Sequence, residues 1–169
     1  MSQDRALRFI MPSMVYVTPS LIVGSQEDAK MPPPDLGGLL IAAEEVMGNV
    51  PSGVPFMRVP LKEFQQADVA GLYQAVQWLE RHVGEKPVMV CCRAGMGRSV
   101  SVLIAYLCCV EGKPFHEALT LVKERRQGAF PLPGLELSIE RVKEWRRDAQ
   151  RLRALDSTTP AAPPHKLAS

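Results

Sequence analysis

The stretch VMVCCRAGMGRSVSV (88–102) constrains the fold more than any other part of the sequence. An apolar run ends in two adjacent cysteines, a loop with two glycines follows, and an apolar run begins after Arg98 and Ser99. The run 87–92 is short and continuous, which is typical of a buried strand, whereas 99–110 has the length and spacing of a buried helix. The sequence therefore predicts a strand, a tight loop and a helix in immediate succession.

The rest of the chain alternates between strand-like and helix-like segments. Two strands around a turn at Pro19 are expected in 15–25, a strand that runs into a short helix in 39–46, and a further strand in 56–61. Amphipathic helices are expected from Asp68 to Gly84, after Pro114 and after Leu135, because apolar residues recur there every three or four positions. Strands that alternate with helices indicate an α/β fold with a mostly parallel central sheet flanked by helices.

Particular residues mark the ends and the faces of these helices. Asp68 is a candidate N-cap, and Gly84 is a candidate stop signal. The inward face of the last helix is expected to comprise Leu135, Ile139, Val142, Trp145 and Leu152. The chain has 169 residues, which suits one domain. We expect it to span 1–155, before a Pro- and Ala-rich, disordered tail at 156–169.

Charge and cysteine usage narrow the class of protein. The formal net charge is only +2, so no nucleic-acid partner is expected. The longest apolar run, 100–110, is too short for a membrane span, and the N-terminal sequence lacks the pattern of a signal peptide. The four cysteines form two adjacent pairs, 91–92 and 108–109, unlike a disulfide framework. These features favour a cytoplasmic, reducing location.

The loop after the first cysteine pair has the chemistry of an oxyanion site. The first amides of a helix lack intrahelical partners, and the helix dipole is positive there. Gly95 and Gly97 allow the loop amides to converge, and Arg98 adds a planar cation that can bind two phosphate oxygens. The same groups stabilise a thiolate at Cys92, and Ser99 can donate a hydrogen bond to that thiolate. The segment thus combines a nucleophile with a binding site for the group it attacks.

The spacing of these residues resembles the signature of the cysteine-dependent protein tyrosine phosphatases. A cysteine, five further residues, an arginine and a serine follow one another, and the string CCRAGMGRS is similar to the dual-specificity phosphatase motif. The resemblance covers roughly residues 13–150 and includes the segments VYVTPSLIVGSQEDA (15–29), VPLKEFQQADVAGLYQAVQWLE (59–80) and VLIAYLCCVEGKPFHEALTLVKERR (102–126). The chain is identified as an atypical member of the dual-specificity family.

The resemblance implies a cysteine-phosphatase fold and hydrolysis of phosphate monoesters on proteins, through a phosphocysteine on Cys92. Phosphotyrosine is the expected substrate, with phosphoserine and phosphothreonine as further ones. The implied catalytic residues are Cys92, Arg98, Ser99 and Glu63, and the implied substrate-binding residues are Arg93, Ala94, Gly95, Met96, Gly97 and Arg98. The implied reaction needs no metal ion or other cofactor. The expected partner is a phosphorylated protein, and the oligomeric state stays open.

The sequence departs from the family pattern at two positions. Cys91 replaces the histidine that usually precedes the nucleophile, and Glu63 occupies the place of the aspartate that serves as general acid. Glutamate performs the same proton chemistry. Asp68 is the alternative acid, and a chain with no dedicated acid is the third possibility. Without an acid, the chain would still cleave esters whose leaving group is stable as an anion.

Other interpretations of these residues stay open. A phosphate-binding module with little or no turnover is the main rival, and a redox sensor built on Cys91 and Cys92 is a weaker one. Cys91, Cys108 and Cys109 are expected to be buried structural residues, and adjacent cysteine pairs lack the usual spacing of zinc ligands. Five other arginines are expected on solvated helix faces: Arg125, Arg126, Arg141, Arg146 and Arg147. The physiological substrate stays open among phosphoproteins, phosphoinositides and RNA ends.

Overall fold

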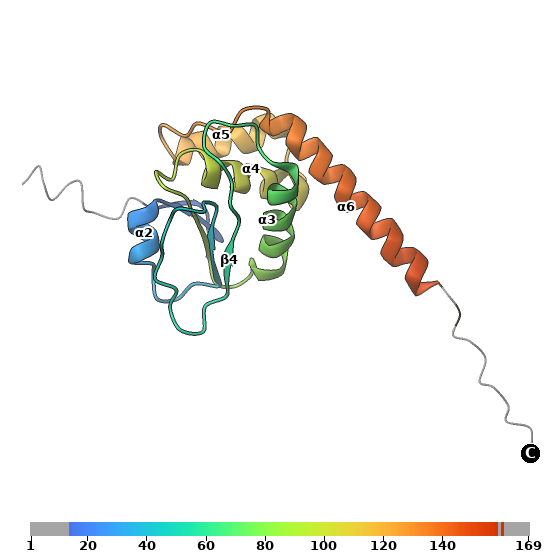
Figure 1. Cartoon of the computed structure of the whole chain (residues 1–169), viewed down its shortest axis with the longest axis horizontal. Helices are drawn as coiled ribbons and strands as arrows, with labels where there is room; N and C mark the ends of the chain where they lie inside the picture. The colour runs from blue at the N-terminus through green and yellow to red at the C-terminus, as the bar shows by residue number, and fades with distance from the viewer. Residues whose placement is uncertain (1–13, 159, 161–169) are drawn as a thin grey trace, which may run out of the picture.

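A five-stranded sheet forms the centre of the computed structural model, which describes residues 14–158 and 160 (Figure 1). The strands are β1 (Val15–Thr18), β2 (Leu21–Gly24), β3 (Gly38–Ile41), β4 (Phe56–Arg58) and β5 (Val88–Cys91). Their order across the sheet is β1-β2-β5-β3-β4. Only β1 is antiparallel to its neighbour, while β2, β5, β3 and β4 are parallel to one another. The mostly parallel α/β sheet confirms the predicted fold class.

Helices cover both faces of this sheet (Figure 1). They are α2 (Gln26–Lys30), α3 (Val69–His82), α4 (Arg98–Cys109), α5 (Phe115–Arg125) and α6 (Leu135–Ser157). The short α2 packs on β2 and β5 from one face. On the other face α4 packs on the same two strands, and α3, α5 and α6 surround α4. Because β5 is the middle strand, its carboxyl end leads the chain to the centre of one sheet edge, where α/β proteins bind ligands.

Burial on both faces explains why the strands are continuously apolar. Successive side chains of a strand point to opposite faces. In β5, Val88 and Val90 join the core beneath the large helices, whereas Met89 and Cys91 join a smaller core beneath α2. The strands β2, β3 and β5 are buried at every position. A run without alternation is therefore the expected pattern for these strands.

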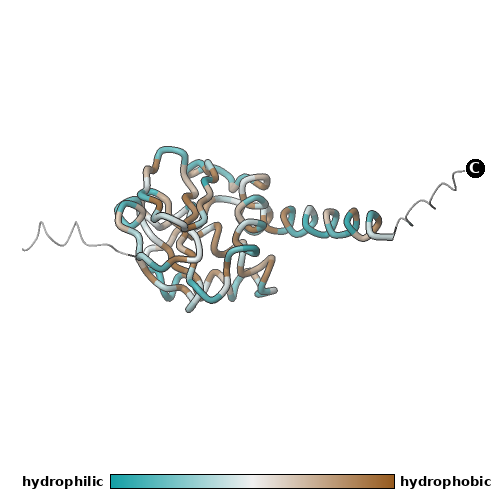
Figure 2. The backbone as a smooth tube through the Cα atoms, turned by 90° about the horizontal axis from the view of Figure 1, so that it is seen from below, coloured by the Kyte–Doolittle hydropathy of each residue, from teal (hydrophilic) through white to brown (hydrophobic). Residues whose placement is uncertain are grey.

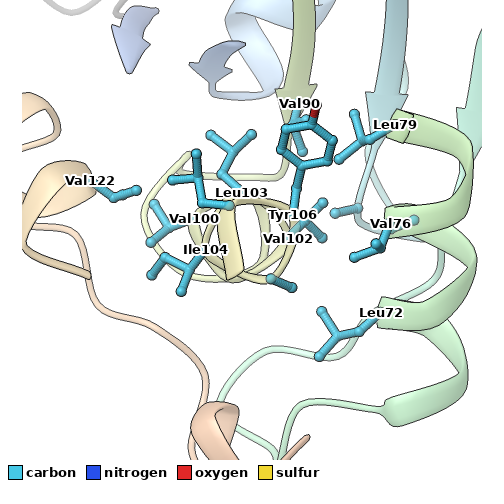
Figure 3. Packing of buried hydrophobic residues seen from close by; sticks show 14 of the residues in the cluster. Leu72, Val76, Leu79, Val90, Val100, Val102, Leu103, Ile104, Tyr106 and Val122 are labelled. Atoms are coloured by element: carbon cyan, nitrogen blue, oxygen red, sulfur yellow. The ribbon is translucent and has the colours of Figure 1, made fainter. Parts of the chain in front are cut away.

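The helix α4 is the centre of the larger core. All its residues from Arg98 to Cys108 are buried. Figure 3 shows α4 in the middle of the cluster, with Leu72, Val76 and Leu79 of α3 directed toward it from one side and Val122 of α5 from the other. A helix surrounded in this way is fixed in position, and so are the residues at its first turn.

The segment after β3 differs from the expectation. The predicted short helix in 39–46 is absent, because the chain turns away after Ile41. Arg58 stabilises this turn: its guanidinium donates to the carbonyl oxygens of Ala43, Glu44 and Val46 over 2.7, 3.3 and 2.6 Å. These carbonyl oxygens accept hydrogen bonds from a side chain and not from the backbone N–H groups of a helix. Glu45 therefore lies in a loop.

The last helix extends beyond the elements that it packs on. Its residues Leu135, Ile139 and Val142 are buried as expected, but Trp145 is 40% and Leu152 is 64% exposed. Figures 1 and 2 show the C-terminal half of α6 projecting away from the other elements. Trp145 instead meets Tyr73 edge-to-face. The helix continues to Ser157, past the predicted domain end, and most of the predicted tail lies outside the described residues.

One of the arginines expected in solvent joins α6 to α3. The side chain of Arg146 is only 10% exposed. It donates to both carboxylate oxygens of Glu80 over 3.0 and 3.1 Å, and it also contacts Gln77. The expectation of a solvated side chain was wrong here, whereas Arg125, Arg141 and Arg147 are exposed as expected. Within the described part of the chain, none of the helices combines the length and the apolar character needed to cross a bilayer.

Replacement of Asp68 tests its role as the cap of α3. Its carboxylate accepts a hydrogen bond of 2.8 Å from the backbone N–H of Gly71, as an N-cap does. Asp68→Ala should lower the free energy of unfolding by about 1 kcal/mol, because an orphan N–H loses its acceptor. Asp68→Asn keeps an acceptor and is the control, with stability close to that of the parent. Chemical denaturation measures both, and equal stability of all three proteins would exclude the capping role.

Candidate active site

Cys92 lies directly after β5, at the carboxyl edge of the sheet. Its backbone N–H donates to the carbonyl of Gly24 over 3.3 Å, which extends the pairing of β5 with β2 by one residue. The side chain is 2% exposed, and its Sγ lies 3.1 Å from Oγ of Ser99 in the first turn of α4. The thiol is thus in contact with a hydroxyl that can donate to it, as the sequence predicts.

The loop from Cys92 to α4 passes very close to β2. Gly95 has φ of +70°, and a Cβ atom there would lie 2.7 Å from the carbonyl oxygen of Gly24 and 2.7 Å from Nη2 of Arg126. Glycine alone fits both the dihedral angle and the space. Arg126, at the end of α5, donates from Nε to the carbonyl of Gly95 over 3.0 Å and from Nη2 to that of Ala94 over 3.2 Å. Arg126 is buried, so the expectation of a solvated residue was wrong.

The remaining carbonyl groups of the loop are also bound by neighbouring elements. The carbonyl of Arg93 accepts from the N–H of Gln26 over 3.0 Å, and that of Met96 accepts from the N–H of Phe130 over 2.7 Å. The Gly97 carbonyl accepts from Oγ of Ser101 over 2.8 Å. A peptide N–H points opposite to the carbonyl of its own unit. The N–H groups of these peptide units therefore point away from the elements that bind the carbonyls.

Arg98 connects this loop to two carboxylates. Its side chain is 2% exposed. Nη1 and Nη2 donate to the two oxygens of Glu45 over 2.9 and 2.5 Å, and Nη2 also donates to Oε1 of Glu63 over 2.8 Å. Nη1 further contacts the carbonyl of Leu61 at 3.2 Å. The Nε group, in contrast, is buried and has no hydrogen-bond partner in the described part of the chain.

The salt bridge with Arg98 lowers the pKa of Glu45, which is the main partner of the guanidinium. The hydrogen bond from Arg98 is the largest cause that lowers the pKa of Glu45 below its ordinary value of 4.5. Glu45 is therefore ionised at neutral pH, and it holds one edge of the guanidinium. On the Nε side Nη2 also donates to Glu63, and Nε itself stays available.

A pocket of about 340 Å³ opens above these groups. Its walls comprise Glu63, Phe64, Cys92, Ala94, Met96, Gly97, Arg98, Phe130, Pro131, Leu132 and Pro133. Most of the site residues predicted from the sequence therefore meet at one pocket. Two loop residues are not among the lining residues: Gly95, which is buried, and Arg93, which is exposed. The second candidate acid, Asp68, lines a different hollow with Lys62 and Gln66.

The other three cysteines lie outside the pocket. Cys91 is fully buried beneath α2, and burial raises the pKa of its thiol far above the ordinary range. Burial also raises the pKa of Cys108 and Cys109 to about 11 each. All three thiols are thus protonated at neutral pH, and Cys91 and Cys108 are buried as expected, whereas Cys109 is only partly buried. The described residues contain no group of three ligating side chains that fits a metal ion.

Several residues of the site had no part in the sequence prediction, among them Glu45, Arg126, Phe64 and Phe130. Glu45 and Arg126 bind the loop or its arginine from distant segments, and Phe64 and Phe130 form pocket walls. Phe64 carried one usable signal, since a large apolar residue in the polar stretch KEFQQAD (62–68) is unusual. The roles of the other three depend on long-range contacts.

The pH dependence of stability tests the Glu45–Arg98 salt bridge. A carboxyl whose pKa is lowered by folding stabilises the folded state when ionised, so the contribution should be complete above pH 4.5 and vanish as the pH falls through the lowered pKa. Glu45→Gln should reduce the free energy of unfolding by about 1 kcal/mol at neutral pH, since the carboxylate is half exposed, and by nearly nothing in acid. Glu44→Gln, at the exposed neighbouring position, is the control and should match the parent. A pH-independent difference would contradict the assignment.

Comparisons with known proteins agree with this geometry. The family model "Dual specificity phosphatase, catalytic domain" matches residues 38–144. Dual specificity protein phosphatase 1B of Arabidopsis thaliana is 38% identical over 63 residues, which are 37% of this chain and 36% of that protein. Human dual specificity protein phosphatase 2 is 26% identical over 137 residues, which are 74% of this chain and 42% of that protein. The chain thus spans less than half the length of these relatives.

The fold is similar to that of a solved human phosphatase structure. The crystal structure of human DUSP28 superposes with a TM-score of 0.71 at 26% sequence identity, and the match covers 82% of this chain and 97% of that one. The family model alone covers more than half of the chain and includes Cys92, Arg98 and Ser99. By sequence and by fold, the chain belongs to the dual-specificity phosphatase catalytic domain family.

Proposed function

We propose that this chain is a cysteine-dependent phosphatase that hydrolyses phosphate monoesters on proteins, phosphotyrosine above all. Cys92 is the nucleophile, the loop 93–98 binds the phosphate, and Glu63 is the general acid. One domain over residues 1–155 carries the activity, without metal or other cofactor. The four cysteines are free thiols, which fits a reducing, cytoplasmic location.

The proposed reaction has two steps. The thiolate of Cys92 attacks phosphorus in line, the S–P bond forms, and the ester P–O bond breaks while Glu63 donates a proton to the leaving oxygen. Water then attacks the phosphocysteine, Glu63 takes its proton, and the S–P bond breaks. Ser99, at 3.1 Å, donates a hydrogen bond to the departing thiolate. The loop amides and Arg98 bind the equatorial oxygens in both transition states.

The unpaired Nε of Arg98 carries this proposal. A buried donor without an acceptor costs about 1–3 kcal/mol, so such a group in a folded protein calls for an explanation. It belongs to a side chain that lines the same pocket as Cys92. A phosphate oxygen held between Nε and the loop amides satisfies this donor. The Glu45 salt bridge occupies the Nη1–Nη2 edge of the guanidinium and leaves Nε free for the phosphate, while Glu63 holds the second N–H of Nη2 on the Nε side.

The contact between Glu63 and Arg98 favours a second candidate function. Nη2 of Arg98 binds both Glu63 and Glu45, so a phosphate that uses Nη2 competes with two carboxylates. A site that keeps this arrangement with ligand bound would retain phosphate without an available acid. The alternative is therefore a phosphate-binding module with little turnover. Phosphate release from an aryl phosphate separates the two functions.

The nucleophile is tested by a matched pair of cysteine variants. Cys92→Ser should release no phosphate from p-nitrophenyl phosphate above background, because a serine hydroxyl is not ionised in this site. The same variant should still bind inorganic phosphate, measured by titration calorimetry. Cys91→Ala is the control and should keep most of the activity, because Cys91 lies outside the pocket. Loss of activity in Cys91→Ala but not in Cys92→Ser would show that Cys92 is not the nucleophile.

The general acid is tested by leaving-group dependence. Glu63→Gln should lower kcat/KM for an alkyl phosphate, whose leaving oxygen needs a proton, by about a hundredfold or more. For p-nitrophenyl phosphate, whose leaving group is stable as an anion, the loss should stay below about fivefold. Asp68→Asn should affect neither substrate, since Asp68 caps α3. Equal losses on both substrates in Glu63→Gln would remove Glu63 from this role.

A further inference from the structure

The projecting half of α6 exposes a row of large apolar side chains on one side of the helix. Trp145 is 40%, Leu152 is 64% and Leu155 is 66% exposed. Figures 1 and 2 show that this half extends beyond the other elements. We call the row Trp145, Asp148, Leu152 and Leu155 the seam of α6, since these residues are three, four and three positions apart. The seam thus has the spacing with which two helices pack along each other.

The seam faces away from the rest of its own chain. Arg146 and Arg153 lie beside Glu80 of α3 in one narrow hollow, so they mark the side of α6 that faces α3. Each helical residue advances by about 100°, which turns Leu152 about 100° and Leu155 about 160° away from Arg153. The high exposure of both leucines agrees with this direction. The body of the chain therefore leaves Leu152 and Leu155 in solvent.

The charges in the seam restrict what can cover it. Asp148 lies between Trp145 and Leu152, and it forms an exposed ion pair of 3.6 Å with Arg151. A membrane surface buries the apolar face of a helix, and a carboxylate within that face opposes such burial. A second helix that brings a cation to Asp148 matches both the apolar residues and the carboxylate.

The seam is complementary to itself when two copies lie antiparallel, with a two-fold axis halfway along it. Trp145 of each copy then lies opposite Leu155 of the other, which pairs large apolar side chains at both ends of the contact. In the middle, Asp148 lies opposite Leu152 and next to Arg151 of the other copy. The charges of the two copies therefore alternate in sign around the axis, and ion pairs of this kind set the orientation of paired helices.

We propose that α6 is a dimerisation helix, through which two copies of this chain associate antiparallel along their seams. Each copy contributes only three large apolar side chains, so the contact is small and the dimer is weak, with a Kd of roughly 10–100 μM. The seam residues are not among those that line the pocket with Cys92, so the dimer leaves this pocket unchanged. Association of this kind is independent of the proposed phosphatase function.

Sedimentation equilibrium of the full chain tests the dimer over concentrations from about 1 μM to about 1 mM. The average mass should rise from that of one chain toward that of two. Leu152→Glu should raise the Kd about tenfold or more, because it removes an apolar contact and places a carboxylate beside Asp148 of the other copy. Leu137→Glu is the matched control: Leu137 is a 70% exposed leucine of α6 outside the seam, and its loss should leave the Kd unchanged.

A charge swap tests the antiparallel orientation. Asp148→Arg and Arg151→Asp should each raise the Kd about fivefold or more, because each places like charges side by side at the axis. The double variant restores opposite charges and should return the Kd to within about twofold of the parent. Arg147→Asp changes the net charge as Arg151→Asp does, but it lies outside the seam and should leave the Kd unchanged.

Two further measurements separate association from folding. Leu152→Glu should keep the circular dichroism and the unfolding midpoint of the parent at low concentration, since Leu152 is exposed in the single chain. Hydrogen exchange near Ser157 should slow as the parent associates. A mass of one chain at every concentration would overturn the dimer, and so would a Kd that is the same in the parent and in Leu152→Glu. Absence of phosphate release from p-nitrophenyl phosphate would count against the proposed function and leave the dimer unaffected.

Discussion

The close approach of Gly95 to β2 is the constraint on which the site depends. The loop backbone lies against the carbonyl of Gly24, and the guanidinium of Arg126 closes the space on its other side. This contact ties the loop to the sheet and to the end of α5 at one point. Since α4 is buried on all sides, the loop is held firmly at both of its ends. The loop and Cys92 are thereby held in place, as electrostatic stabilisation of the transition state in the proposed reaction requires.

Arg98 is a buried cation in addition to the anion-binding role that we propose for it. A buried charge must be compensated, and Glu45 and Glu63 provide this from two loops after β3 and β4. The same guanidinium thus links three segments at the carboxyl edge of the sheet. In the proposed function, an arriving phosphate brings negative charge to a group that two carboxylates already neutralise. The balance between phosphate and the carboxylate of Glu63 would then govern both the affinity for phosphate and the availability of the proposed acid.

Local patterns predicted the parts of the molecule that local forces determine. The strand–loop–helix order around Cys92, the cap at Asp68 and the placement of Ser99 follow from burial, capping and spacing within a few residues. Arg126 and Glu45 were missed because their partners lie 31 and 53 residues away. An arginine that crosses to a distant loop has the same local sequence as a solvated one. Trp145 and Leu152 continue the apolar period of α6, but the period does not reveal where the packing partner ends.

The projecting half of α6 has a consequence for the dynamics of the chain. Its residues from Gln150 onward are exposed, whereas its first turns bury Leu135, Ile139 and Val142 in the main core. Backbone amides in the first turns open only when the core opens, but those near the end open by fraying of the helix alone. Hydrogen exchange along this single helix should therefore accelerate steeply toward Ser157. One continuous helix thus contains a segment that reports global unfolding and a segment that melts and reforms independently of the active site.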